Sequence, residues 1–192
     1  MPASPPSYHP LIENRPVATL YTIGHSTRTF DELVAALKAY DIETLVDIRA
    51  FPMSRRLPQF NRESLERSLP EQGIRYVWMK TLGGYRKATR KDSPHTALRN
   101  ASFRNYADYT LTPEFERAAG ELLQIANESR TAYMCAERVY FRCHRMIVSD
   151  WLVAHGHEVL HIDAEGPTQP HKLFAEARVI EGQLIYRGDN LF

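Results

Sequence analysis

Residues 19–48, TLYTIGHSTRTFDELVAALKAYDIETLVDI, decide the fold class of this chain. The apolar run at 19–23 predicts a buried strand that stops at a glycine. Thr29 is followed three positions later by Glu32, the spacing of a capping box at a helix start. The β-branched run at 43–48 then predicts a second strand. A strand, a capped helix and a strand in this order make a βαβ unit, which indicates a parallel sheet with a right-handed crossover.

The rest of the chain continues this alternation. We expect strands at 74–78, 130–134 and 158–162, helices at 61–73, from Thr112-Pro113 onward and at 142–155, and a hairpin of 177–180 with 184–186. The expected fold is therefore α/β, a three-layer α/β/α arrangement with a mostly parallel five-stranded sheet and a small C-terminal β-hairpin. Residues 1–16 are rich in proline and serine and predict a flexible N-terminal arm. Residues 17–192 then form a single α/β domain, with a basic insertion near 85–102.

Composition narrows the class of protein. Apolar residues make up 43% of the chain and charged residues 24%, which is ordinary for a globular protein. No run approaches the roughly 18 apolar residues of a membrane span, and the N-terminal stretch lacks the apolar core of a signal peptide. We therefore expect a cytoplasmic protein with no membrane partner. Two cysteines are too few for a disulfide scaffold. The oligomeric state stays open.

Charge is distributed unevenly along the chain. Residues 49–104 contain 13 Lys and Arg against 4 Asp and Glu, whereas the remainder has 11 against 19. A basic face would attract an anionic small molecule or a nucleic acid. The alternative is that these charges only solvate an irregular surface.

Polar and reactive side chains follow every predicted strand. Ligands of open parallel sheets bind beyond the carboxyl ends of the strands, so these positions are candidates for a site. The first strand leads to His25 and Ser26, the second to Asp47 and Arg49, the third to Gly83 and Gly84, the fourth to Cys135 and Glu137, and the fifth to His161 and Asp163.

The two cysteines allow several interpretations. Cys143, His144 and Arg145 fall in the expected first helical turn, where free amides and the helix dipole would stabilise a thiolate. Cys143 and Cys135 are equally interpretable as small packed residues. Zinc is a further alternative, because Cys135, Cys143, His144 and His25 offer thiolate and imidazole ligands. No C-x-x-C pair is present, however, and we expect no metal and no cofactor.

The chain resembles an uncharacterised family known as domain of unknown function 488. The resemblance rests on Thr22-Ile-Gly-His-Ser26, Leu45-Val-Asp-Ile-Arg49, the run 51–61, Leu82-Gly-Gly84, the run 103–109, Met134-Cys-Ala-Glu137, Arg142-Cys-His-Arg145, His171-Lys-Leu173 and the closing Leu191-Phe192. It spans about residues 21–192. The resemblance implies a compact α/β fold and a shared site, and it brings no established reaction.

Together these features predict an enzyme acting on a phosphate-bearing substrate, such as a nucleotide or a nucleic acid. Glu137 and Asp47 would be acid/base or sugar-binding carboxylates, and Cys143 a nucleophile. His25 and His144 would orient groups or move protons. The expected substrate contacts are Arg49, Arg55, Arg56 and Arg145, with Ser26, Gln59, Gly83, Gly84, Tyr106 and Cys135 around them. The alternatives are a non-catalytic module that binds nucleic acid or nucleotide, and a thiol- or zinc-dependent site.

Overall fold

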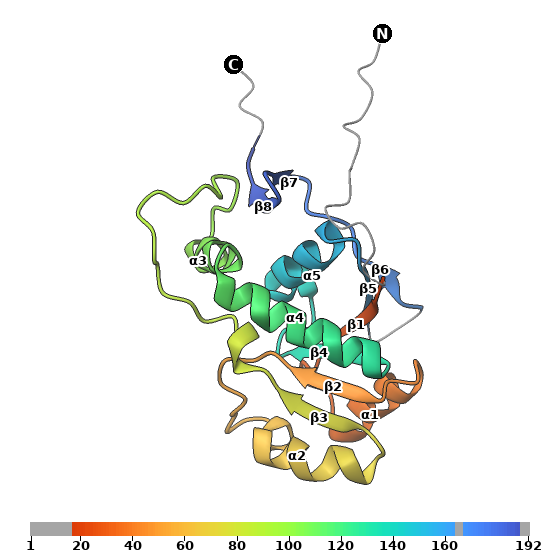
Figure 1. Ribbon diagram of the computed structural model, residues 1–192. Coiled ribbons are helices and arrows are strands. Elements are labelled where there is room, and N and C mark those ends of the chain that lie inside the picture. Colours follow the sequence, from red (N-terminus) through yellow and green to blue (C-terminus); the bar gives the residue numbers. More distant parts are fainter. Residues whose placement is uncertain (1–16, 164–166, 189–192) are drawn as a thin grey trace.

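The computed structural model describes residues 17–163 and 167–188 (Figure 1). The expected arm at 1–16 and the closing Leu191-Phe192 lie outside the described residues. In the described ranges, no helix is both long and apolar enough to cross a membrane.

The centre of the molecule is a six-stranded sheet with the order β3-β2-β4-β1-β5-β6. Its five parallel strands are β1 (Thr19–Gly24), β2 (Thr44–Asp47), β3 (Arg75–Trp78), β4 (Thr131–Cys135) and β5 (Glu158–Ile162). The expected α/β class with a mostly parallel sheet is confirmed. The sequence patterns missed only β6 (Gln169–Pro170), which pairs antiparallel with β5. Two residues are too few to show a strand period.

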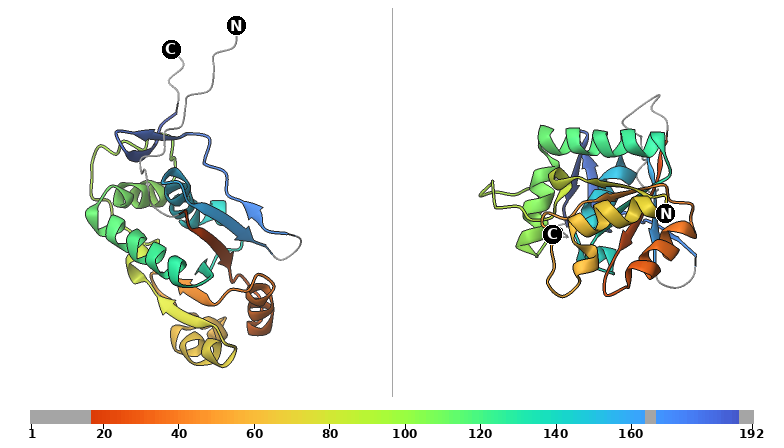
Figure 2. Two further views of the ribbon diagram at one scale, coloured as in Figure 1. Left: turned by 45° about the vertical axis from the view of Figure 1, so that its right-hand side comes forward. Right: turned by 90° about the horizontal axis from the view of Figure 1, so that it is seen from below.

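Helices cover both faces of this sheet, which makes three layers (Figure 2). On one face, α1 (Phe30–Lys38) and α2 (Arg62–Glu71) pack their apolar residues against Tyr21, Ile23, Leu45 and Met134. On the other face, α3 (Ala101–Thr110), α4 (Pro113–Glu128) and α5 (Arg145–Ala154) pack against Leu20, Val46 and Tyr133. The helix α3 contains Tyr106, one of the expected substrate contacts.

Local sequence signals fix several of these boundaries. The Thr29 hydroxyl accepts the Glu32 amide hydrogen, and the Glu32 carboxylate accepts the Thr29 amide hydrogen, so the capping box is confirmed. The C-terminal hairpin pairs β7 (Ala177–Ile180) with β8 (Gln183–Tyr186). Its turn residues Glu181 and Gly182 have φ of 49° and 81°. Two successive positive φ values characterise the type I′ turn, whose twist matches that of the strands.

The long connection between β3 and α3 lies outside the layers. After the 3₁₀ turn η2 (Lys80–Leu82), residues 83–100 contain no helix or strand and swing out as the loop at the left of Figure 1. This loop includes most of the expected basic insertion. Its first residues turn back over the end of β4, where the candidate site lies.

The strand order places a topological switch point at the carboxyl end of β4. This strand lies between β2 and β1, and both of its neighbours lead to helices on one face of the sheet. β4 itself leads through the 3₁₀ turn η3 (Tyr140–Arg142) to α5 on the opposite face. Chains that leave adjacent strands toward opposite faces open a topological switch point, where α/β proteins bind their ligands.

Candidate functional site

Three reactive side chains meet at the carboxyl end of β4. Cys135 is the last residue of β4, and Cys143 and His144 directly precede α5. His144 Nδ1 lies 3.4 Å from Cys143 Sγ and 3.8 Å from Cys135 Sγ, and the three atoms lie within 4.8 Å of one another. All three residues are buried. We call Cys135, Cys143 and His144 the thiol cluster.

The orientation of the His144 ring is fixed from its far side. His144 Nε2 lies 3.0 Å from the carbonyl oxygen of Ile48, so Nε2 carries the hydrogen and donates it. Neutral imidazole then has its lone pair on Nδ1, the atom that faces both sulfurs. A backbone carbonyl, which has no tautomer of its own, therefore sets the protonation pattern of the cluster.

Two residues lie beside this ring: Gly84 in the connection between β3 and α3, and Tyr106 on α3. A Cβ atom added to Gly84 would lie 2.4 Å from His144 Nδ1, so only glycine fits this approach. The Tyr106 ring lies with its centroid 5.0 Å from that of His144, and its hydroxyl donates to the Leu82 carbonyl oxygen at 2.7 Å. Both residues were expected near a ligand, and here they contact the thiol cluster itself.

The two thiols of the cluster differ in acidity. Hydrogen bonding from the Cys135 thiol, followed by the charge and backbone amide of Arg145, lowers the pKa of Cys143 to about 7 despite its burial. The same contact with Cys143, together with burial, raises the pKa of Cys135. Cys143 is therefore the more acidic thiol of the pair.

The expected helix start at 142 is wrong, and this changes the reason for the Cys143 acidity. The turn η3 ends at Arg142, Cys143 is extended with φ −134° and ψ 154°, and α5 begins only at Arg145. Cys143 thus precedes the helix instead of lying in its first turn. The pKa of Cys143 is lowered first by the neighbouring thiol, and then by the guanidinium and the backbone amide of Arg145. Arg145 is the first residue of α5, so the expected free amide at the helix start does contact Cys143.

Asp47, Arg49 and His25 form a second buried group beside the thiol cluster. Arg49 Nε donates to Asp47 Oδ1 at 2.8 Å, Nη2 donates to the Phe60 carbonyl oxygen at 2.8 Å, and Nη1 lies 3.2 Å from His25 Nε2. Burial and the Arg49 charge lower the pKa of His25 to about 4. The Tyr76 hydroxyl completes the group by donating to Asp47 Oδ2 at 2.7 Å. Arg49 is thus engaged within the protein, holding β2 to the loop at Phe60.

Arg145 holds the turn that follows β4. Its Nη1 donates to the Thr22 hydroxyl at 3.1 Å, and its Nη2 donates to the carbonyl oxygens of Arg138, at 3.0 Å, and Glu137. Gly24 permits this turn, because an added Cβ would lie 1.8 Å from the Glu137 carbonyl oxygen. A buried guanidinium and a glycine together position the thiol cluster relative to β1.

Other expected site residues lie away from the thiol cluster. The chain bends at Ala136, so the Glu137 side chain is exposed while the Cys135 side chain is buried. Cys135 and Glu137 therefore lie on different sides of the chain. Arg55 and Arg56 are exposed in the loop before the 3₁₀ turn η1 (Pro58–Phe60). In that turn Gln59 donates to the Arg28 carbonyl oxygen at 3.2 Å, while Gly83 packs on Ala50.

Two hollows lie at the carboxyl ends of β1 and β5. A groove of about 540 Å³ is lined by the half-buried Ser26, by Arg28 and Arg138, and by Asp163 and residues of α1. A cavity of about 160 Å³ adjoins it, since Arg138, Ile162 and Asp163 line both. No sequence motif pointed to Arg28 or Arg138. Their place after β1 and after β4, at strand ends, was the available signal.

A chain of buried, hydrogen-bonded side chains lies near this cavity. The strand-end rule pointed to one of its residues, His161, but not to the partners of that residue. His161 Nε2 lies 2.8 Å from His171 Nδ1, and His171 Nε2 lies 2.9 Å from Asp150 Oδ1. We call Asp150, His171 and His161 the histidine relay. The residues come from α5, from the segment after β6 and from β5, so their spacing in sequence carries no motif. The Cys-His contacts of the thiol cluster have a nearby sequence signature, and the relay has none.

Comparison with known proteins yields one match. The sequence profile described as "Domain of unknown function DUF488" matches residues 29–152, well over half of the chain, and this range includes the whole thiol cluster. No curated protein and no solved structure matches the chain significantly.

Proposed function

This chain belongs to the family described as domain of unknown function DUF488, and we propose that it is an enzyme whose reactive group is the Cys143 thiolate and whose substrate bears a phosphate. The family description assigns no reaction, so the proposal rests on the contacts of the described residues.

The observation that carries the proposal is the fixed tautomer of His144. Because Nε2 donates to the Ile48 carbonyl oxygen at 3.0 Å, the lone pair of Nδ1 faces Cys143 Sγ at 3.4 Å. A base within reach of the thiol, itself oriented by a third group, is the usual arrangement of an activated nucleophile. In this arrangement His144 accepts the proton of Cys143, and the remaining thiolate attacks an electrophilic atom of the substrate. The bond from that atom to its leaving group breaks, and the leaving group takes the proton from His144.

Cys135 has a separate part in this scheme. Its thiol keeps its proton and donates to the Cys143 thiolate, which lowers the pKa of Cys143. In this proposal Cys135 acts on Cys143 as a hydrogen-bond donor that keeps its own proton.

The phosphate in the proposed substrate is supported by the distribution of cations. Arg28 and Arg138 line the groove at the ends of β1 and β5, and Arg55 and Arg56 are exposed in the loop after β2. Guanidinium groups bind phosphate oxygens in pairs of parallel hydrogen bonds. A nucleotide or a nucleic acid would bring such phosphates. Arg49 and Arg145 are engaged with protein groups and act as positioning residues in this proposal.

Selective alkylation tests the thiolate. The metal-free protein is treated with iodoacetamide at pH 7.5, and labelling is followed by intact mass for the parent and for Cys143→Ala, Cys135→Ala and His144→Gln. We expect the first label at Cys143, and loss of that fast label in Cys143→Ala. His144→Gln should slow it by about 10-fold, because glutamine offers no base. Equal labelling rates for the two cysteines would contradict the proposal.

Turnover separates this enzyme from a binding module. The parent and Cys143→Ala are each incubated with single-stranded and duplex oligonucleotides and with nucleoside phosphates, and the products are resolved by mass spectrometry. The proposal requires a product that Cys143→Ala does not form. Salt-dependent binding without any product would instead indicate a non-catalytic nucleic-acid module.

Zinc binding is a second candidate, and the distances in the thiol cluster favour it. Tetrahedral zinc with Zn–S of about 2.3 Å and Zn–N of about 2.0 Å sets sulfur and nitrogen ligands roughly 3.6 Å apart. The observed distances from His144 Nδ1 to the two sulfurs are 3.4 and 3.8 Å. The Ile48 carbonyl at His144 Nε2 is the outer contact that a metal-bound histidine usually makes.

Metal analysis decides between the two candidates. The chain is expressed with added zinc, desalted, and measured by elemental mass spectrometry beside Cys135→Ala and His144→Gln. One zinc per chain that both variants lose would favour a metal centre. A parent protein that holds less than about a tenth of an equivalent would favour the thiolate.

A further inference from the structure

The histidine relay has a defined direction of hydrogen bonding. Asp150 accepts three hydrogen bonds: from the Phe174 amide at 2.9 Å, from the Tyr186 hydroxyl at 2.8 Å, and from His171 Nε2 at 2.9 Å. As a carboxylate it can only accept, so His171 Nε2 carries the hydrogen. In a neutral His171 ring Nδ1 is then an acceptor, and the hydrogen between the two rings belongs to His161 Nε2.

This direction leaves His161 Nδ1 with a lone pair. Among the described residues, His161 Nδ1 has no hydrogen-bond partner, although the residue is only 6% exposed. Burial, together with the charge of Arg145, lowers the pKa of His161 to about 3, so the ring is neutral. The Tyr140 ring stacks on it with centroids 3.6 Å apart and an angle of 8° between the planes. The ring is therefore held in place with one acceptor unused.

Unused polar atoms gather around the two adjoining hollows. Five buried side-chain nitrogens in the described ranges have no partner, and three of them belong to residues that line these hollows. They are His161 Nδ1 and Arg145 Nε in residues of the 160 Å³ cavity, and Arg28 Nη2 in a residue of the 540 Å³ groove. Buried polar groups in proteins are almost always paired, so such a concentration indicates a ligand.

The chemistry of the ligand follows from these atoms. The guanidinium groups of Arg28 and Arg138 donate hydrogen bonds and carry positive charge, which suits a phosphate. His161 Nδ1 is an acceptor, so the ligand must donate a hydrogen to it, as a hydroxyl does. One molecule that satisfies both ends is a phosphate ester with a free hydroxyl on its organic part.

We propose that the His161 cavity and the adjoining groove bind a polyol or sugar phosphate, with its phosphate on Arg28 and Arg138 and a hydroxyl donating to His161 Nδ1. The ligand class agrees with the phosphate of the proposed function, and this inference rests on it only in that respect, since it needs no reaction at Cys143. Asp150 and His171 are positioning residues that keep Nδ1 of His161 an acceptor.

A pair of matched ligands tests the proposal by calorimetric titration. Glycerol 3-phosphate and n-propyl phosphate have the same carbon count and the same charge, and only the first carries hydroxyls. We expect glycerol 3-phosphate to bind the parent protein about 10-fold more tightly, because it alone pairs the buried acceptor. In His161→Phe this preference should fall to about 1.

Arginine variants test the phosphate end. Arg138→Gln should lower the affinity of the protein for both ligands by about 10-fold, since it removes a contact to the phosphate that they share. The ratio of the two affinities should stay unchanged. Arg62→Gln is the matched control: Arg62 is an exposed arginine paired with Glu66 on α2, away from both hollows, and its loss should change neither affinity. Arg138 is itself exposed and paired with Asp163, so its substitution should leave the fold intact.

Three results would overturn the proposal: equal affinities of the two ligands for the parent, a preference that survives in His161→Phe, or an unchanged affinity in Arg138→Gln. If His161→Phe fails to fold, the ¹⁵N shift of His161 Nδ1 in the parent replaces it, and that shift must respond to glycerol 3-phosphate and not to propyl phosphate. Cys143→Ser should bind both ligands as the parent does. Failure of the thiolate proposal and failure of this one are thereby distinguished.

Discussion

The thiol cluster and the histidine relay each hold one histidine by its Nε2 atom, and they differ in what lies next to its Nδ1 atom. In each, the protein fixes Nε2 of a histidine: the Ile48 carbonyl oxygen holds that of His144, and His171 holds that of His161. Each ring therefore presents an unprotonated Nδ1 at the carboxyl edge of the sheet. Nδ1 of His144 meets two sulfurs, whereas Nδ1 of His161 has no partner among the described residues.

This difference shows that the group next to the free nitrogen of a histidine decides which chemistry that histidine can perform. A histidine with a thiol at its free nitrogen is equipped for nucleophilic or metal chemistry. A histidine with an unused acceptor beside a cavity is equipped to bind a donor. Arg145 connects the two regions, because its charge lowers the pKa of both Cys143 and His161. Four substitutions, two beside or in each region, are expected to change the stability of the protein or the acidity of Cys143 by different amounts.

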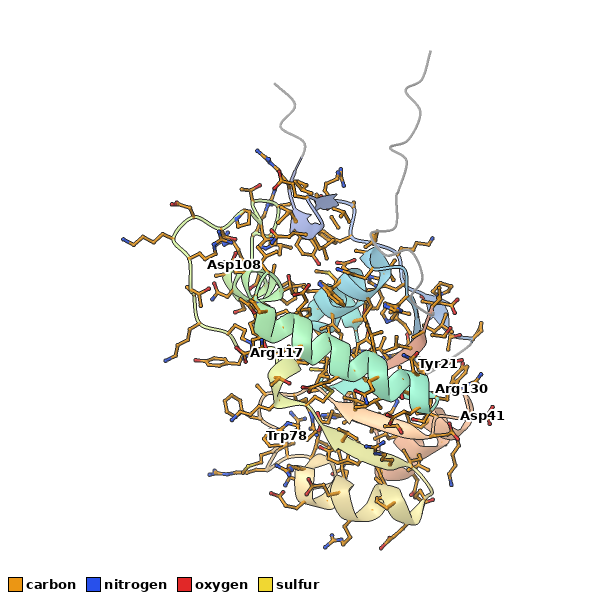
Figure 3. The ribbon with its side chains drawn as sticks, viewed as in Figure 1. Tyr21, Asp41, Trp78, Asp108, Arg117 and Arg130 are labelled. Atoms are coloured by element: carbon orange, nitrogen blue, oxygen red, sulfur yellow. The ribbon has the colours of Figure 1, made fainter. Side chains whose placement is uncertain are left out.

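Asp150→Asn should have the largest effect, a loss of about 3 kcal/mol in the free energy of unfolding. Three donors converge on the buried carboxylate, and an amide would turn an NH₂ group toward one of them. Urea denaturation measures the loss. The matched control is Asp41→Asn, because Asp41 is exposed at the opposite edge of the sheet beside Arg130, 3.5 Å away (Figure 3). Similar losses in the two variants would contradict the account of the relay.

Gly84→Ala should lower the free energy of unfolding by about 2 kcal/mol and slow the alkylation of Cys143. The added methyl group would overlap the His144 ring at Nδ1 and force it away from the sulfurs. Gly120→Ala is the control, because the corresponding position on α4 faces open space and alanine favours a helix. That variant should be as stable as the parent or more so. An undisturbed alkylation rate in Gly84→Ala would show that the ring position does not govern Cys143.

Cys135→Ala should raise the pKa of Cys143 by about one unit, equivalent to about 1.4 kcal/mol. In the metal-free parent, the pKa of about 7 means that the Cys143 thiolate forms as the pH rises through 7. The rate of alkylation should rise over the same range and level off above it, whereas an ordinary thiol still gains reactivity beyond pH 8. Removal of the Cys135 donor moves this midpoint upward. A midpoint that stays near 7 would assign the low pKa to Arg145 alone.

Tyr140→Leu should have the smallest effect. It should lower the free energy of unfolding by about 1 kcal/mol, because it removes the ring that stacks on His161. The adjacent Phe141 is 56% exposed, so Phe141→Leu should change the free energy of unfolding by less than about 0.5 kcal/mol. Chemical denaturation of both variants provides the comparison. If the two losses are equal, the stack does not hold the His161 ring.

Local signals in the sequence predicted local structure well. The capping box at Thr29, the proline at the start of α4 and the Glu181-Gly182 turn each act within a few residues, and each is found in the structure. The predicted helix start at 142 was wrong, and its cause also lies within a few residues of that position. The turn η3 ends at Arg142 and leaves Cys143 extended, and the residues themselves give no signal that distinguishes these two conformations.

The site was predictable only in its location. The rule that ligands bind beyond strand ends brought His25, Asp47 and Cys135 to one edge of the sheet, where the structure has them. It could not show that Arg49 pairs with Asp47 or that the bend at Ala136 turns Glu137 outward, because both depend on how the loops close. The functional roles assigned to these residues stay predictions.

The sequence by itself determined the α/β class, the parallel sheet and the family, because strand and helix periods and ordered motifs are written along the chain. The tertiary structure alone decided which nitrogen of His144 and of His161 is free. The partners that fix them, Ile48 and His171, are 96 and 10 residues away in the chain, and Asp150 completes the relay from α5. Which ring nitrogen carries the hydrogen depends on contacts between residues far apart in the chain, and such contacts leave no periodic pattern in the sequence.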